Sequence, residues 1–166
     1  MSSHVDAVAV FNTRSVKGEI TFTDKKGGLA VEAIFTKLPP GEHGFHIHKA
    51  GDLRGEGCKL ACEHFHKGSG PADKGVHGDA PSGAKGKDRP RHTGDLGNVS
   101  LPASKDPIIR QYKYTLRDVS AEELWGRSVI VHEDPDDLGL GEKEDSLTTG
   151  HSGRRIACAV IGRTLC

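Results

Sequence analysis

The chain has 166 residues, a length that suits one domain with a sizeable buried core. Its 23 Lys and Arg residues balance its 23 Asp and Glu residues, so the formal charge at pH 7 is zero. The net charge therefore gives no general electrostatic attraction to nucleic acid or to an anionic membrane. The 22 glycines argue against a helical bundle, and no apolar run is long enough to cross a membrane as a helix.

Apolar residues recur with a period of two in most of the apolar segments, a pattern typical of half-buried strands. Such strands are expected, in chain order, within residues 5–11, 19–23, 29–36, 45–48, 112–116, 129–132 and 156–161. About eight short strands with Gly-rich turns between them predict an all-β fold, either a sandwich or a barrel. One helical turn is expected at 120–124, where Ser120 and Glu123 have the spacing of a capping box.

Two long segments, residues 51–96 and 134–155, carry no strand signal. Loops of this length in a compact domain are usually functional, or are held together by something other than a hydrophobic core. No internal repeat and no linker divide the chain, so a single domain over residues 1–166 is expected.

The 10 histidines are concentrated around these segments, and imidazole is the commonest metal ligand. His46 and His48 stand two residues apart on a predicted strand, so both rings leave the same face, opposite to Phe45 and Ile47. That pair forms half of a metal site, although two exposed histidines without a role would have the same spacing.

The first long segment contains His64, His77, His92 and Asp95, a donor set that suits a closed zinc site. A bound ion would also explain how a Gly-rich loop stays ordered. The alternative is a solvated loop with scattered histidines.

His132 ends an apolar strand, and a lone histidine there is more often a satisfied edge residue than a ligand.

Several longer motifs resemble one family, the copper,zinc superoxide dismutases. They are Gly44-Phe45-His46-Ile47-His48, the segments 92–99 and 131–139, and Arg155-Ile156-Ala157-Cys158. They occur in the family's order over essentially the whole chain. The resemblance implies an eight-stranded antiparallel Greek-key β-barrel or sandwich, with a metal loop and an electrostatic loop.

The resemblance also implies a cofactor set of one copper and one zinc ion per subunit. The copper ligands would be His46, His48, His64 and His132. The zinc ligands would be His64, His77, His92 and Asp95, with His64 shared by both ions and His77 preferred over His66. Asp136 would orient one histidine of each ion, Arg155 would hold the anionic substrate, and Cys58 and Cys158 would form a disulfide.

The activity implied is antioxidant defence by copper-dependent disproportionation of superoxide to dioxygen and hydrogen peroxide, with His64 and Arg155 as catalytic residues. A homodimer is expected, with an atypical interface because Ala50, Trp125 and Arg163 stand where the family has its contacts. A copper chaperone is a further expected partner, and neither nucleic acid nor a membrane is.

Three departures from the family pattern bear on the function. Thr148 occupies a position that is often a lysine in the electrostatic loop, so the positive charge that guides the substrate is weaker there or comes from Arg154. A basic insert covers residues 83–91, for which a surface insertion is favoured over a recognition segment. Cys62 and Cys166 have no partner in the pattern.

The chain's first residues lack the basic and apolar segments of a secretory signal, so a cytoplasmic, intracellular-type protein is expected. The competing interpretations of the whole are a related module that delivers copper without catalysis and a structural protein with zinc alone.

Overall fold

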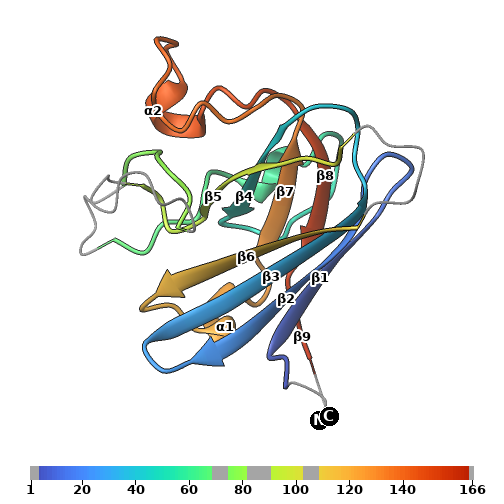
Figure 1. Cartoon of the computed structure of the whole chain (residues 1–166). Coiled ribbons are helices and arrows are strands. Elements are labelled where there is room, and N and C mark those ends of the chain that lie inside the picture. Colours follow the sequence, from blue (N-terminus) through green and yellow to red (C-terminus); the bar gives the residue numbers. More distant parts are fainter. Residues whose placement is uncertain (1–3, 69–74, 82–90, 103–108, 165–166) are drawn as a thin grey trace.

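Two antiparallel sheets face each other in the computed structural model, which describes residues 4–68, 75–81, 91–102 and 109–164 (Figure 1). The first sheet has the strand order β6-β3-β2-β1-β9, and the second has the order β5-β4-β7-β8. The bounds of the first sheet are β1 Ala7–Asn12, β2 Lys17–Lys25, β3 Gly28–Lys37, β6 Arg110–Arg117 and β9 Gly162–Arg163. Those of the second are β4 His43–His48, β5 Asp95–Val99, β7 Ser128–His132 and β8 Arg155–Val160.

Helix is limited, in the described residues, to three single turns: η1 Lys59–Ala61, α1 Ala121–Leu124 and α2 Ser146–Thr149. The α1 turn confirms the capping-box prediction, since Ser120 N donates a hydrogen bond of 2.9 Å to Glu123 Oε2. No helix among the described residues has both the length and the apolar character needed to span a membrane.

The chain crosses between the sheets in a Greek-key order. It passes from β3 in the first sheet to β4 in the second, returns as β6 to pair with β3, and crosses again to β7, which pairs with β4. This confirms the all-β prediction. The long loops after β4 and β7 both emerge at the second sheet (Figure 1).

Alternation of apolar and polar residues explains which side of each strand is buried. In β2 and β3 the residues Ile20, Phe22, Leu29 and Val31 turn inward and are at most 1% exposed. They meet side chains of the second sheet, where the Phe35 and Phe45 rings pack edge to face with centroids 5.5 Å apart. Burying such side chains stabilises the fold by about 1.5–3 kcal/mol each.

The strand β5 was not predicted. Gly97 and Asn98 lie in its middle, both residue types are poor in strands, and Gly97 has a φ of 79°. Its pairing with β4 is a long-range contact that no local pattern reveals. Residues 83–90 of the predicted basic insert, and Cys166, lie outside the described residues.

Candidate metal centre

The strand β4 is buried on both faces, although its sequence alternates between histidine and apolar residues. Phe45 and Ile47 enter the core between the sheets, and His46 and His48 leave the opposite face. Those two rings are nevertheless 0% and 1% exposed. They are therefore not the exposed surface histidines of the alternative interpretation.

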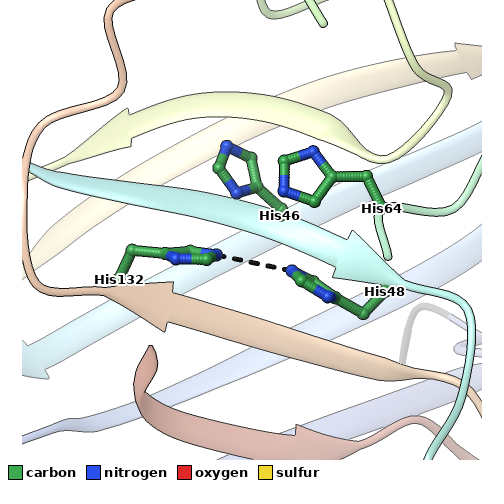
Figure 2. A group of neighbouring side chains, drawn as sticks. All are labelled: His46, His48, His64 and His132. Carbon is green, nitrogen blue, oxygen red and sulfur yellow. Dashed lines mark hydrogen bonds between the residues drawn. The ribbon is translucent and has the colours of Figure 1, made fainter. Parts of the chain in front are cut away.

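Four imidazoles from three parts of the chain converge over this face. β7 pairs with β4 and ends at His132, and His64 forms an isolated bridge to His48. One nitrogen of each ring of His46, His48, His64 and His132 lies within 4.8 Å of the others. Figure 2 shows His46 and His64 next to each other, and His48 and His132 joined by a dashed line. We call these four residues the histidine cluster.

The contact between the His48 and His132 rings is favourable only when a cation lies between them. Cys62 O lies 2.9 Å from His48 Nδ1 and Gly153 O lies 3.2 Å from His132 Nδ1. Carbonyl oxygens only accept hydrogen bonds, so each Nδ1 carries the proton and each Nε2 presents a lone pair. The two Nε2 atoms lie 3.4 Å apart. Two facing lone pairs repel unless a positive ion lies between them.

Burial keeps these rings neutral. Loss of hydration on burial lowers the pKa of His46 and His48 well below the usual range, and interactions with the neighbouring imidazoles lower it further. The pKa of His132 falls to about 3, mainly for the same reason. A neutral imidazole is the form that binds a metal, so the histidine cluster is ready to bind one at neutral pH.

A second cluster is built around the Asp95 carboxylate, which is fully buried. Asp95 Oδ1 lies 2.9 Å from His64 Nδ1 and 3.1 Å from His77 Nδ1, and Oδ2 lies 3.4 Å from His92 Nδ1. Burial raises the pKa of Asp95, but its contacts with these three rings outweigh that effect and hold the pKa far below the usual range. The carboxylate is therefore ionised.

His92 lies at the margin of this second cluster. The group whose ligand atoms all lie within 4.8 Å of one another consists of His46, His64, His77 and Asp95, without His92. His46, however, already belongs to the histidine cluster, whereas His92 Nδ1 is buried, lies 3.4 Å from Asp95 Oδ2 and has no hydrogen-bond partner. We therefore place His92, rather than His46, with the Asp95 cluster.

Asp136 joins the two clusters through one carboxylate. Its Oδ2 accepts a hydrogen bond of 2.7 Å from His46 Nε2, and its Oδ1 accepts one of 2.7 Å from His77 Nε2. Each ring thereby has a proton on Nε2 and turns Nδ1 toward its own cluster. Burial alone would lower the pKa of His77, but its interactions with the Asp136 and Asp95 carboxylates raise it to about 9. Without a metal ion the ring therefore holds a second proton at neutral pH, and an ion bound at Nδ1 would displace that proton.

Among the residues that the structure describes, four buried ring nitrogens lack a hydrogen-bond partner: His46 Nδ1, His64 Nε2, His77 Nδ1 and His92 Nδ1. Buried polar atoms rarely go without a partner, and these four all face the clusters. Imidazoles alone suit a copper ion, and imidazoles with one carboxylate suit zinc. The residues present therefore fit both ions.

Arg155 begins β8 directly opposite His132 in the strand register. Its Nη1 donates to Cys58 O at 2.7 Å and its Nη2 donates to Cys62 O at 2.5 Å. Cys62 O also accepts from His48 Nδ1, so one carbonyl orients both the guanidinium and a ring of the histidine cluster. Cys58 is held in place by a disulfide to Cys158, which confirms the expected pairing.

Two residues that support the site were missed. Asn98 makes reciprocal hydrogen bonds of 2.9 and 2.6 Å with the backbone of Asp136, and no local pattern indicates this. Gly150 has a φ of 68°, and a Cβ there would lie 2.1 Å from Asp136 Oδ1. A larger residue would displace the carboxylate, so only glycine fits at this position.

Other expected features are found at the surface. Arg154, one of the two alternatives for the guiding charge, is paired with Glu133 through two contacts of 2.7 Å. Thr148, expected in the electrostatic loop, lines a cavity together with Lys143, Glu144, Asp145 and His151. At the expected dimer surface, the Arg163 guanidinium lies 5.0 Å from the centroid of the Trp125 ring.

Comparison with known proteins points to one family. The family model described as copper/zinc superoxide dismutase (SODC) matches residues 16–161. The chain is 38% identical to a Cu-Zn superoxide dismutase of Paramecium bursaria Chlorella virus 1, over 95% of this chain and 78% of that protein. It is 44% identical to an extracellular Cu-Zn superoxide dismutase of Haemonchus contortus, over 95% of this chain and 79% of that protein. The crystal structure of the clock protein EA4 superposes with a TM-score of 0.76 at 35% identity, over 99% of this chain and 98% of that one.

The predicted cytoplasmic location is wrong. The Haemonchus contortus relative and a second one, from Caenorhabditis elegans, 42% identical over 87% of this chain and 60% of that protein, are both named extracellular. The chain also contains the Cys58–Cys158 disulfide, a type of bond that persists mainly in oxidising compartments. The start of the chain was not a sound basis for assigning the compartment.

Proposed function

This chain belongs to the copper/zinc superoxide dismutase family, and we propose that its histidine cluster binds the copper ion while His64, His77, His92 and Asp95 bind the zinc ion. Its reaction converts two superoxide anions and two protons into one dioxygen and one hydrogen peroxide. Copper supplies the one-electron oxidation and reduction, and zinc is redox-silent. The main support for this ligand assignment is that four buried ring nitrogens in the two clusters have no hydrogen-bond partner.

His64 is proposed as the residue that links the two ions and handles a proton. Its Nδ1 faces Asp95 at 2.9 Å, and its Nε2 is buried, without a hydrogen-bond partner, on the side of the histidine cluster. Nε2 is therefore the atom at which this ring can take up a proton and donate it to the reduced substrate.

Arg155 is proposed to hold the substrate anion. Two of its donors are occupied by the carbonyls of Cys58 and Cys62, which keeps the guanidinium plane in a defined orientation beside His48 and His132. A guanidinium stays positively charged at any pH of interest and has further N–H groups to offer a small anion.

Metal analysis combined with a superoxide assay tests this function. The purified chain is expected to bind copper and zinc in equal amounts and to dismutate superoxide, and removal of copper by a chelator is expected to abolish the activity. Equal binding of both ions without activity would instead support the copper-delivery module. Binding of zinc alone would support the structural protein.

Substitution of Asp136 by asparagine tests the proposed orienting role. An amide can accept through only one of its two heavy atoms, so either His46 or His77 loses its partner. We expect zinc or copper affinity to fall about 10–100-fold, as for other outer partners of metal-bound histidines. Competition with a metal-sensitive dye measures both affinities.

The matched control for that experiment is Asp118→Asn. Asp118 is exposed and has a φ of 55°, a conformation that asparagine tolerates well. Its metal affinities should equal those of the wild type. Unchanged affinities in the Asp136 variant would remove the basis for the proposed role.

We also propose a homodimer that uses the surface around Trp125. The Trp125 side chain and Val160 are 36% and 42% exposed, and Gly126 N bonds to Ile161 O, which brings their segments together. Arg163 covers part of the Trp125 ring and adds a charge, which distinguishes this patch from a purely apolar interface. Sedimentation of the metal-loaded chain should give twice the monomer mass, and a monomer at high concentration would contradict the proposal.

An extracellular site of action is the location we propose. The two nematode relatives named extracellular and the disulfide support it. Detection of the protein in the medium of the cells that express it naturally is the supporting result, and retention in the cytosol is the contrary one.

A further inference from the structure

A cavity of about 620 Å³ opens beside Arg155 on the surface of the second sheet. Three basic residues line it, Lys59, Arg154 and Arg155, together with Ser15, Gly153 and Ile156. None of the described residues that line it carries a carboxylate. The cavity therefore has a positive wall and leads to the guanidinium that stands next to the histidine cluster.

The three basic residues differ in how much of their charge is free. Arg154 is paired with Glu133 through two contacts of 2.7 Å, and the negative charge of Asp134 also attracts its guanidinium. Arg155 is half-buried and has two donors on backbone carbonyls. The Lys59 side chain is exposed, and it has no ion pair among the contacts found in the described part of the chain.

The position of Lys59 is fixed by the same elements that fix Arg155. Lys59 begins η1, directly after the disulfide-bonded Cys58, and its carbonyl lies 3.4 Å from Arg155 Nη1. Its ammonium group moves on a flexible stem, but the stem starts from a rigid turn at the wall of the cavity. The charge therefore stays near the route to Arg155.

We infer that Lys59 is a positioning residue that draws superoxide into this cavity and toward Arg155. The inference rests on the proposed function, because superoxide is the anion concerned. An unpaired cation at the wall of a cavity raises the local concentration of an anion and its rate of encounter, and salt screens the effect. Arg154 contributes little, because Glu133 neutralises it.

The test compares Lys59→Gln, Lys59→Glu and Lys59→Arg with the control Lys26→Gln in the metal-loaded full chain. Lys26 lies in the turn between β2 and β3, is exposed, and gives the same change of net charge. At low ionic strength we expect kcat/KM to fall about 2-fold in the glutamine variant and further in the glutamate variant, with a shallower dependence on salt. Lys59→Arg and Lys26→Gln should match the wild type.

Azide gives a second measurement that does not depend on turnover. It is a small monovalent anion, and its binding to the copper protein can be followed by the visible absorption spectrum. Its Kd should rise about 2-fold in Lys59→Gln at low salt and should converge with the wild-type value when salt screens the charge.

Each outcome decides between the alternatives. If Lys59→Gln and Lys26→Gln lower kcat/KM equally, only net charge matters and the inference is wrong. If the wild type is active and all Lys59 variants keep its rate, its salt dependence and its azide Kd, the inference fails while the proposed function stands. If the wild type loaded with both metals is inactive, the proposed function itself has failed.

Discussion

Substitution of His48 by alanine is expected to lower dismutation at least about 100-fold, because even an outer partner of a metal ligand is worth 10–100-fold in metal affinity and His48 is a proposed direct ligand. Zinc binding should survive, since His48 lies outside the Asp95 cluster. The measurement is the copper and zinc content of the purified variant together with its activity. The distinctive result is a chain that keeps zinc and loses copper.

Two controls make that result interpretable. His4→Ala removes an exposed imidazole that contacts only Asp6 in the described structure, and it should keep full copper content and activity. The retained zinc of the His48 variant reports that the metal loop is still folded. A His48 variant that binds copper as tightly as the wild type would overturn the ligand assignment.

Loss of the disulfide is expected to have the largest effect on stability. Cys58 and Cys158 are 100 residues apart, and a cross-link that closes a loop of this size restricts the unfolded chain by an amount worth about 4.7 kcal/mol in the entropic model. Measured losses for native disulfides lie at about 2–5 kcal/mol. Denaturant unfolding of Cys58→Ser should show a loss in this range.

Activity should also fall in the Cys58 variant, because Cys58 O accepts a hydrogen bond from Arg155 and the disulfide holds that segment against β8. Cys62→Ser is the matched control, since Cys62 is a free, exposed cysteine of the same loop. It should unfold with the wild-type free energy. A Cys58 variant within about 1 kcal/mol of the wild type would show that the chain's contacts, not the cross-link, hold the loop.

The parts of the fold that could be predicted are those with local causes. The period-two alternation of β2 and β3 and the capping box of Ser120 and Glu123 each depend on residues a few positions apart. The strand β5 could not be predicted in the same way, because its pairing with β4 joins segments about 50 residues apart and its own composition is poor in strand formers.

The features of the site can likewise be separated into those with local causes and those that depend on long-range contacts. The pair His46 and His48 is visible in the strand pattern, and a donor set of His64, His77, His92 and Asp95 was proposed from their place in one loop. The role of His132 and the sharing of His64 were expected only from the family resemblance. The contacts that prepare the ligands for metal come mostly from the backbone, such as Cys62 O on His48 and Gly153 O on His132. Backbone carbonyls have no signature in a sequence, because every residue has one.

The shared carboxylate of Asp136 has a thermodynamic consequence. Asp136 holds His46 in one cluster and His77 in the other. An ion that binds one of these rings restrains that ring and, through it, the Asp136 carboxylate. The carboxylate then restrains the second ring in the position that suits an ion. Filling one cluster is therefore expected to prepare the other, so we predict that the two ions bind with positive cooperativity. Reciprocity then requires that copper strengthens zinc binding by the same factor by which zinc strengthens copper binding.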